Sequence, residues 1–161
     1  MRGRFFLILA ALAIVFPIRL SIRSENRGRV YAFETAALKA IQTLNTAQVQ
    51  YNSTFGRFAT SLTELGPSDG GTSHASAADL ISGHLASGHL ASGEKLGYKY
   101  TLTGTPGGYA ITAVPSAFGL TGSRTFFSDQ SLVIRENYGQ EPATAHSREV
   151  GTAASKRSQR W

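Results

Sequence analysis

Four histidines are the residues of this chain best able to do chemistry, either as metal ligands or as proton carriers. They are His74, His84, His89 and His146. His84 and His89 are five positions apart, which does not stack them on one helix face as a spacing of four would. The sequence has no cysteine, and no cluster of carboxylates accompanies the histidines. We therefore expect no metal site and no cofactor.

The sequence offers little that is typical of catalysis. G-x-S-x-G occurs once, as GPSDG at residues 66–70, but this stretch is a loop by composition and does not join a strand to a helix as a nucleophile elbow does. The glycine patterns that bind nucleotide phosphates do not occur. The 17 glycines occur singly or in turns, where their tolerance of positive φ angles explains them. We therefore expect that the chain is not an enzyme.

Aromatic residues gather in the second half of the chain, where they could form a stacking platform for single-stranded nucleic acid. Arginine and lysine are not interleaved densely among them, and one face of a sheet has to cover a helix. A core role is therefore the better interpretation. The residues concerned are Tyr98, Tyr100, Tyr109, Phe126 and Phe127.

The basic residues gather at the two ends of the chain. The net charge is +6, but residues 30–139 hold six basic and seven acidic residues and are nearly neutral. Basic ends that flank an apolar segment suit anionic lipid headgroups at least as well as nucleic-acid phosphates. A membrane is therefore the expected partner. Nucleic-acid contact through the basic tail, which ends in KRSQRW, stays open as an alternative.

Residues 32–56 are predicted to form the helix around which the chain is organised. No proline interrupts them, and no glycine occurs before Gly56. Apolar residues at steps of three and four draw one stripe, so the helix should lie on a core. The predicted core face is Phe33, Ala37, Ile41, Leu44, Tyr51 and Phe55, with Val30 and Ala47 on the same stripe. The expected outer surface includes Gln42, Asn45, Thr46 and Gln50.

An apolar run precedes this helix and is predicted to be a membrane anchor. As a helix, Phe5 to Ile18 would span about 21 Å, and extension through Ile22 brings it to about 27 Å, close to the roughly 30 Å hydrocarbon core. We expect an uncleaved or specially processed anchor. A cleavable signal peptide, a buried core helix and a wrong start codon are the alternatives. The anchor residues are Phe5, Phe6, Leu7, Ile8, Leu9, Leu12, Ile14, Val15 and Phe16.

From Tyr98 the apolar period becomes two, which predicts strands with one buried face. Short connections favour an antiparallel meander. The expected strands are 98–103, 109–114, 124–128 and 132–135. Before them, SGHLA occurs at 82–86 and again at 87–91, as expected of a duplication in a surface loop or short helix. Residues 139–161 are predicted to be a flexible basic tail.

The string ETAALKAIQTLNTAQVQYNSTFGRFATSLTELGP, residues 34–67, resembles the helix and following loop of type IV pilin-like proteins, including the major pseudopilins of type II secretion. GYAITAVP and RTFFSDQSLVIR resemble the sheet of the family's globular heads, so the similarity covers about residues 32–137. The resemblance implies an inner-membrane, single-pass protein with a periplasmic or extracellular head. It also implies that the anchor helix packs against other pilin-like subunits and an assembly platform.

The N-terminus departs from the family's pattern at two positions. Pilin precursors have a basic leader, a glycine at the cleavage point, and an apolar helix with phenylalanine first and glutamate fifth. Here Phe5 follows a basic leader, but Arg4 stands at the glycine position and Leu9 at the glutamate position. In pilins that glutamate is thought to pair with a neighbouring subunit's terminal amine, because an unpaired charge in an apolar filament core is costly.

The sequence thus predicts an α+β fold, with a long N-terminal helix packed on a three- to four-stranded antiparallel sheet. Its expected parts are a leader and anchor (1–31), a pilin-like head (32–138) and the tail (139–161). The expected function is a structural subunit of a surface filament or of a secretion or DNA-uptake assembly. The alternative is a membrane-tethered or secreted binding module that keeps the pilin-like head and does not polymerise.

Overall fold

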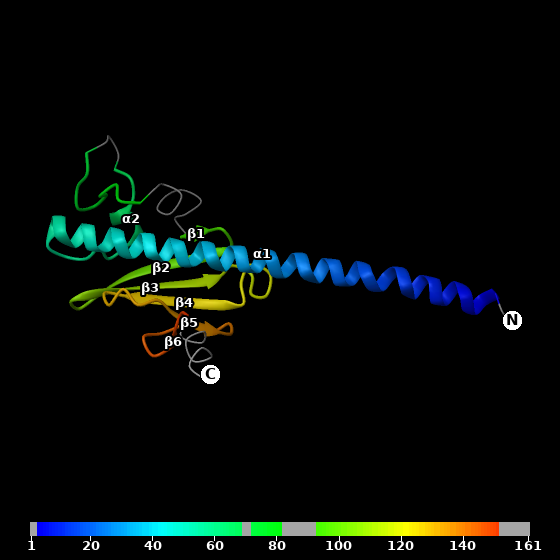
Figure 1. The fold of residues 1–161 in the computed structure, drawn as a ribbon. Coiled ribbons are helices and arrows are strands. Elements are labelled where there is room, and N and C mark those ends of the chain that lie inside the picture. The colour runs from blue at the N-terminus through cyan, green and yellow to red at the C-terminus, as the bar shows by residue number, and fades with distance from the viewer. Residues whose placement is uncertain (1–2, 69–71, 82–92, 152–161) are drawn as a thin grey trace, which may run out of the picture.

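A single long helix lies along one face of an antiparallel sheet and extends well beyond it (Figure 1). The computed structural model describes residues 3–68, 72–81 and 93–151, with the side chains of the first helix described from Asn26 onward. This helix, α1, runs from Gly3 to Phe55 over 53 residues. Its C-terminal half packs on the sheet, while its N-terminal half reaches away from the head. The predicted α+β class is confirmed.

The sheet has six strands in the order β1-β2-β3-β4-β5-β6, and every neighbouring pair is antiparallel. The predicted three to four strands were therefore too few, because the two outermost strands are only two residues long and leave no periodic pattern. The strands are β1 (Glu94–Lys95), β2 (Tyr98–Thr105), β3 (Gly108–Pro115), β4 (Arg124–Asp129), β5 (Arg135–Tyr138) and β6 (Arg148–Glu149).

Strand β2 alternates as its sequence predicts. Tyr98, Tyr100 and Leu102 are buried, whereas the intervening Lys99 and Thr101 are exposed. The buried side chains face α1, because the helix covers this side of the sheet (Figure 1). The aromatic residues of β2 and β3 are thus core residues, and Tyr98, Tyr100 and Tyr109 are nearly inaccessible to solvent.

The strand predicted at residues 132–135 was placed three residues too early, because the observed strand β5 is Arg135–Tyr138. Leu132 lies in a turn with a φ angle of 63°, and its backbone N–H donates to the carbonyl of Asp129 at 2.9 Å. The Asp129 carboxylate also accepts from the backbone of Ser131, so the aspartate closes the turn and β5 begins only at Arg135. An apolar Leu-Val-Ile run gives no sign of this turn.

The boundary predicted for the tail is also too early. Residues 148–149 form β6, and the side chain of Ala143 is 2% exposed. Thr125 in β4 donates to the carbonyl of Glu141 at 2.7 Å, which ties this segment to the sheet. Polar contacts to the backbone, which leave no apolar period in the sequence, hold residues 139–151 in place.

A short helix, α2 (Leu62–Leu65), follows α1 and packs under its C-terminal end. Ser61 caps it, and its side chain accepts from the backbone N–H of Glu64. Residues 78–81 then return alongside α2 through backbone bonds to Glu64, Leu65 and Gly66. This layer closes the core at the C-terminal end of α1.

We expect Ile41→Ala or Leu44→Ala to lower the free energy of unfolding by about 2–5 kcal/mol, because both side chains are fully buried against the sheet. Gln42→Ala is the matched control, since Gln42 is adjacent in the helix but exposed, and should change stability by less than roughly 0.5 kcal/mol. Urea titrations of the full-length chain in detergent, followed by near-ultraviolet circular dichroism, measure the difference. Equal losses at Ile41 and Gln42 would mean that the buried face is misassigned.

Candidate functional site

The face by which α1 attaches to the head is the candidate functional surface. Of its predicted core residues, Ala37, Ile41, Leu44 and Tyr51 are fully buried, and Phe33 and Phe55 are partly buried against the same cluster. These six residues therefore meet on one side of the helix. The predicted anchor residues from Phe5 to Phe16 have side chains outside the described set.

Three polar side chains lie on the same buried face: Glu34, Asn45 and Gln48 are 5%, 6% and 0% exposed. The prediction that Asn45 belongs to the outer surface is therefore wrong. A buried polar group is costly unless its hydrogen bonds are satisfied, so the partners of these three residues fix how the helix sits.

Glu34 is attached to the segment that leads into β4. Its Oε1 accepts from the backbone N–H and from the hydroxyl of Ser123, both at 2.8 Å. Its Oε2 accepts from Nε of Arg124 at 2.9 Å and forms an ion pair with Nη2 at 2.7 Å. Both carboxylate oxygens are thus engaged: Ser123 binds Oε1, and two nitrogens of the Arg124 guanidinium converge on Oε2 in charge-assisted contacts.

The ion pair continues across the sheet. Nη1 of Arg124 binds Glu136 in β5 at 2.7 Å, and the other oxygen of Glu136 accepts from Arg148 in β6 at 2.6 Å. Glu136 is itself 4% exposed. A line of alternating charges therefore joins α1 to β4, β5 and β6.

Burial by itself would raise the pKa of the Glu34 carboxyl, but the bonds from Ser123 and Arg124 outweigh it and hold the pKa below its usual value of 4.5. The carboxylates of Glu34 and Glu136 raise the pKa of the Arg124 guanidinium despite the opposing effect of burial. Both groups are therefore ionised across the physiological pH range.

Asn45 joins the middle of the helix to two strands. Its Nδ2 donates to the hydroxyl of Ser128 in β4 at 2.9 Å, and its Oδ1 accepts from the hydroxyl of Tyr109 in β3 at 3.0 Å. Burial, together with the charge of Asp129, raises the pKa of Tyr109 to about 12, so its hydroxyl stays protonated and remains a donor. The amide thus spans β3 and β4.

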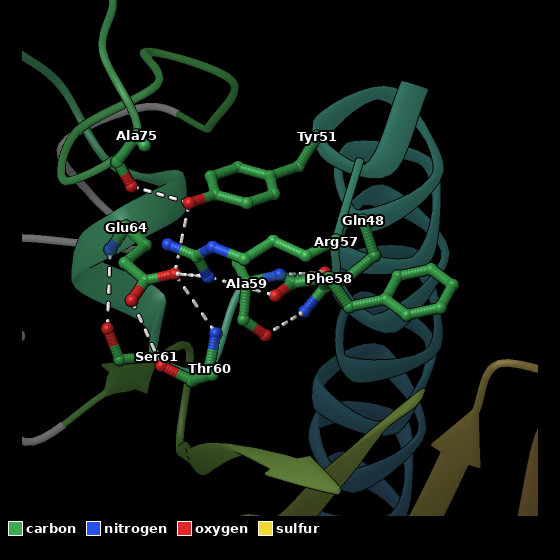
Figure 2. A network of polar contacts seen from close by, with 9 residues as sticks. All are labelled: Gln48, Tyr51, Arg57, Phe58, Ala59, Thr60, Ser61, Glu64 and Ala75. Carbon is green, nitrogen blue, oxygen red and sulfur yellow. Dashed lines mark hydrogen bonds and ion pairs between the residues drawn. The ribbon is translucent and has the colours of Figure 1, made fainter. Parts of the chain in front are cut away.

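The third attachment lies at the C-terminal end of α1 (Figure 2). Gln48 makes two bonds of 2.9 Å with the backbone N–H and C=O of Ala59, as a neighbouring strand would. The Glu64 carboxylate accepts from Thr60 and pairs with Arg57 at 2.9 Å, and the Tyr51 hydroxyl lies 3.1 Å from it. Together these contacts fold the chain back after Gly56, whose φ angle is 69°.

The residues that could do chemistry are not brought together. His74 contacts Ser76, and His146 is exposed, while His84, His89 and the SGHLA repeats lie outside the described residues. Within the described ranges no group of three or more potential ligands is arranged to hold a metal. A groove of about 740 Å³ lies between the end of α1 and the β2–β3 turn, and its charged lining residue, Arg57, is paired with Glu64.

Sequence reasoning missed Glu34 and Gln48, although the signal for both was available. Glu34, Ala37, Ile41, Leu44 and Gln48 follow one another at steps of three and four, so both polar residues stand on the apolar stripe. A glutamate in that position demands a cationic partner. The sequence could not name Arg124, which is 90 positions away.

Comparison with known proteins finds no matching family model, no matching curated protein and no matching solved structure. From Asn26 onward, where the side chains are described, no helix combines the length and hydropathy needed to cross a membrane.

We expect Glu34→Gln to lower the free energy of unfolding by about 3–5 kcal/mol at pH 7, because it leaves Arg124 buried without one of its two carboxylates. Glu94→Gln is the control, since it breaks the solvent-exposed ion pair with Lys99 and should cost less than about 1 kcal/mol. Equal losses in urea titrations of the two variants would contradict a dominant role for the Glu34 pair.

The stabilisation by Glu34 should depend on pH. Because its pKa is lowered on folding, the contribution is fully present above pH 4.5 and is lost as the pH falls through the folded-state value. The difference in stability between the wild type and Glu34→Gln should therefore shrink in titrations between pH 7 and pH 3. A difference that stays constant over this range would show that the carboxylate does not titrate with folding.

Proposed function

We propose that the chain is a pilin-like or pseudopilin-like structural subunit of a surface filament or of a secretion or DNA-uptake assembly. One observation carries this proposal: among the described side chains, Glu34, Asn45 and Gln48 attach α1 to the head along its C-terminal half, while the same helix continues beyond the head (Figure 1). A helix built in this way offers its free half to other partners.

The sequence of the free half supports an inner-membrane, single-pass anchor. Residues 5–18 are almost wholly apolar, with Arg2 and Arg4 before them and Arg19, Arg23, Arg27 and Arg29 after them. Arginines close to the ends of an apolar helix reach the headgroup region along their aliphatic stems. The head then lies in the periplasm or outside the cell.

The proposed work of the protein is packing and involves no reaction. In a filament the partners are other pilin-like subunits, an assembly platform and the membrane that stores the subunit. The helix contributes apolar contacts, among them those of Leu9, where pilins carry a glutamate. Without that carboxylate, recruitment depends on apolar packing alone, which suits a minor component or an initiator of assembly.

The second candidate is a membrane-tethered or secreted binding module. Arg4 and Leu9 favour it, because they replace the residues that pilins use for processing and for pairing with a neighbour's terminal amine. Such a module keeps the head and the anchor but does not polymerise.

We expect the double variant Arg4→Gly, Leu9→Glu to enter sheared surface filaments more than the wild type does, because it restores the two family residues. An immunoblot of sheared filaments, normalised to the membrane fraction of the same cells, measures incorporation. Arg4→Gly, Leu9→Gln is the matched control, since the amide has the same size but lacks the charge.

Absence of both proteins from filaments, with both stable in the membrane, would overturn the filament function in favour of the binding module. Recovery of the uncleaved full-length wild type wholly in the soluble fraction would overturn the anchor itself.

A further inference from the structure

Exposed apolar side chains gather at the end of the head where α1 leaves it. Tyr31 of the helix is 69% exposed, and Phe118 and Leu120 of the loop between β3 and β4 are 40% and 59% exposed. This loop, residues 116–123, lies beside the helix at the end of the sheet nearer the N-terminus (Figure 1). We call Tyr31, Phe118 and Leu120 the collar.

The collar loop is rigidly built. Thr121 bonds with the backbone of Ala117 through both its N–H and its hydroxyl, and the N–H of Gly119 donates to Gly122 at 2.7 Å. Gly122 packs so tightly against Tyr98 that a side chain could not fit there. A loop held at so many points cannot turn Phe118 and Leu120 inward, so their exposure is a fixed feature of the surface.

Ser123 joins the loop to α1, because its N–H and hydroxyl both bind the buried carboxylate of Glu34. A groove of about 390 Å³ between the two is lined by Asn26, Arg27 and Tyr31 from the helix and by Gly119 from the loop. The loop therefore reaches back along the helix as far as the turn that contains Asn26.

This position can be compared with the depth of a membrane. Asn26 follows Ile22, the end of the proposed anchor, by four residues, which is about 6 Å at the helical rise. The headgroup region adds roughly 5–8 Å on each side of the hydrocarbon core. An anchor that ends at Ile22 thus brings the collar loop to headgroup level.

The charge of this surface suits the same environment. The loop from Ser116 to Ser123 has no charged side chain, whereas Arg27 and Arg29 are exposed on the adjoining turns of α1. Glu34 is paired with Arg124, and Glu25 stands in the sequence between Arg23 and Arg27. Arg23, Arg27 and Arg29 outnumber Glu25, so the net charge of these turns attracts an anionic lipid.

We propose that the collar is a lipid-contacting surface, in which Phe118, Leu120 and Tyr31 enter the headgroup region while Arg27 and Arg29 bind lipid phosphates. Amphipathic aromatic rings favour this interface, and the apolar loop tip adds buried area. The contact sets the depth and tilt of the head on the membrane before assembly. It rests on the proposed anchor, but it is a separate property of the head.

The sequence makes a direct test simple, because it contains no native cysteine. Single cysteines replace Phe118, Leu120, Val49 and Leu12 in the full-length chain, and each carries an environment-sensitive fluorophore. The variants are reconstituted in vesicles of phosphatidylcholine that contain roughly 30% phosphatidylglycerol, because phosphatidylglycerol gives the vesicle surface its negative charge. Lipids with a nitroxide near the headgroup, or deep in the chain, quench the probes.

We expect headgroup nitroxides to quench the probes at 118 and 120 at least about threefold more than the probe at Val49. Val49 is also 49% exposed but lies 23 residues beyond Asn26, about 35 Å farther along the helix. The probe at Leu12 should respond to the deep nitroxide. Arg27→Gln with Arg29→Gln should lower the quenching at 118 toward its value in vesicles of phosphatidylcholine alone.

Three results would overturn the inference. If the probes at 118 and 120 are quenched no more than the probe at Val49, while the deep nitroxide quenches the probe at Leu12, the collar does not contact lipid but the anchor does span the membrane. An unquenched Leu12 probe removes the anchor and the collar contact together. A blue shift at 118 that rises with protein density and is insensitive to both nitroxides assigns the collar to a second copy of this chain.

Discussion

The buried carboxylate of Glu34 is the constraint on which the placement of α1 depends. An apolar helix face can slide or rotate on a sheet at modest cost, because dispersion and burial have no direction. A buried glutamate cannot, since it loses several kcal/mol wherever Arg124 and Ser123 do not meet it. Asn45 acts similarly farther along the helix through Ser128 in β4 and Tyr109 in β3, so two polar attachments fix the register of α1 on the sheet. Gln48 holds the loop after α1 against the helix through Ala59. Replacing such groups by well-packed apolar residues is often neutral or stabilising, which suggests that their value here is specificity.

The apolar pattern of the sequence was enough for the class of fold and for much of the core. The stripe from Ala37 to Tyr51 and the alternation in β2 both follow from periodicity, because one side of each element has to leave water. Local pattern did not reveal β1 and β6, since two residues hold no period. It also misplaced β5, because the turn at Asp129 depends on side-chain bonds to the backbone.

The polar attachments were harder to predict for a different reason. Asn45 looks like a surface residue until Tyr109 and Ser128 are placed beside it, and those partners are 64 and 83 positions away. Gln48 forms its hydrogen bonds with the backbone of Ala59, and backbone groups leave no signature in the sequence. The presence of a polar residue on an apolar stripe can therefore be read in advance, whereas its partner depends on the topology of the sheet.

The shortness of β1 and β6 has a consequence for how copies of this protein meet. An open sheet edge is a template on which a second chain can add its own strand, and long flat edges lead to uncontrolled aggregation. Here each outermost strand offers only two residues for such pairing. The short outer strands therefore discourage two copies of this protein from pairing strand to strand at their sheet edges.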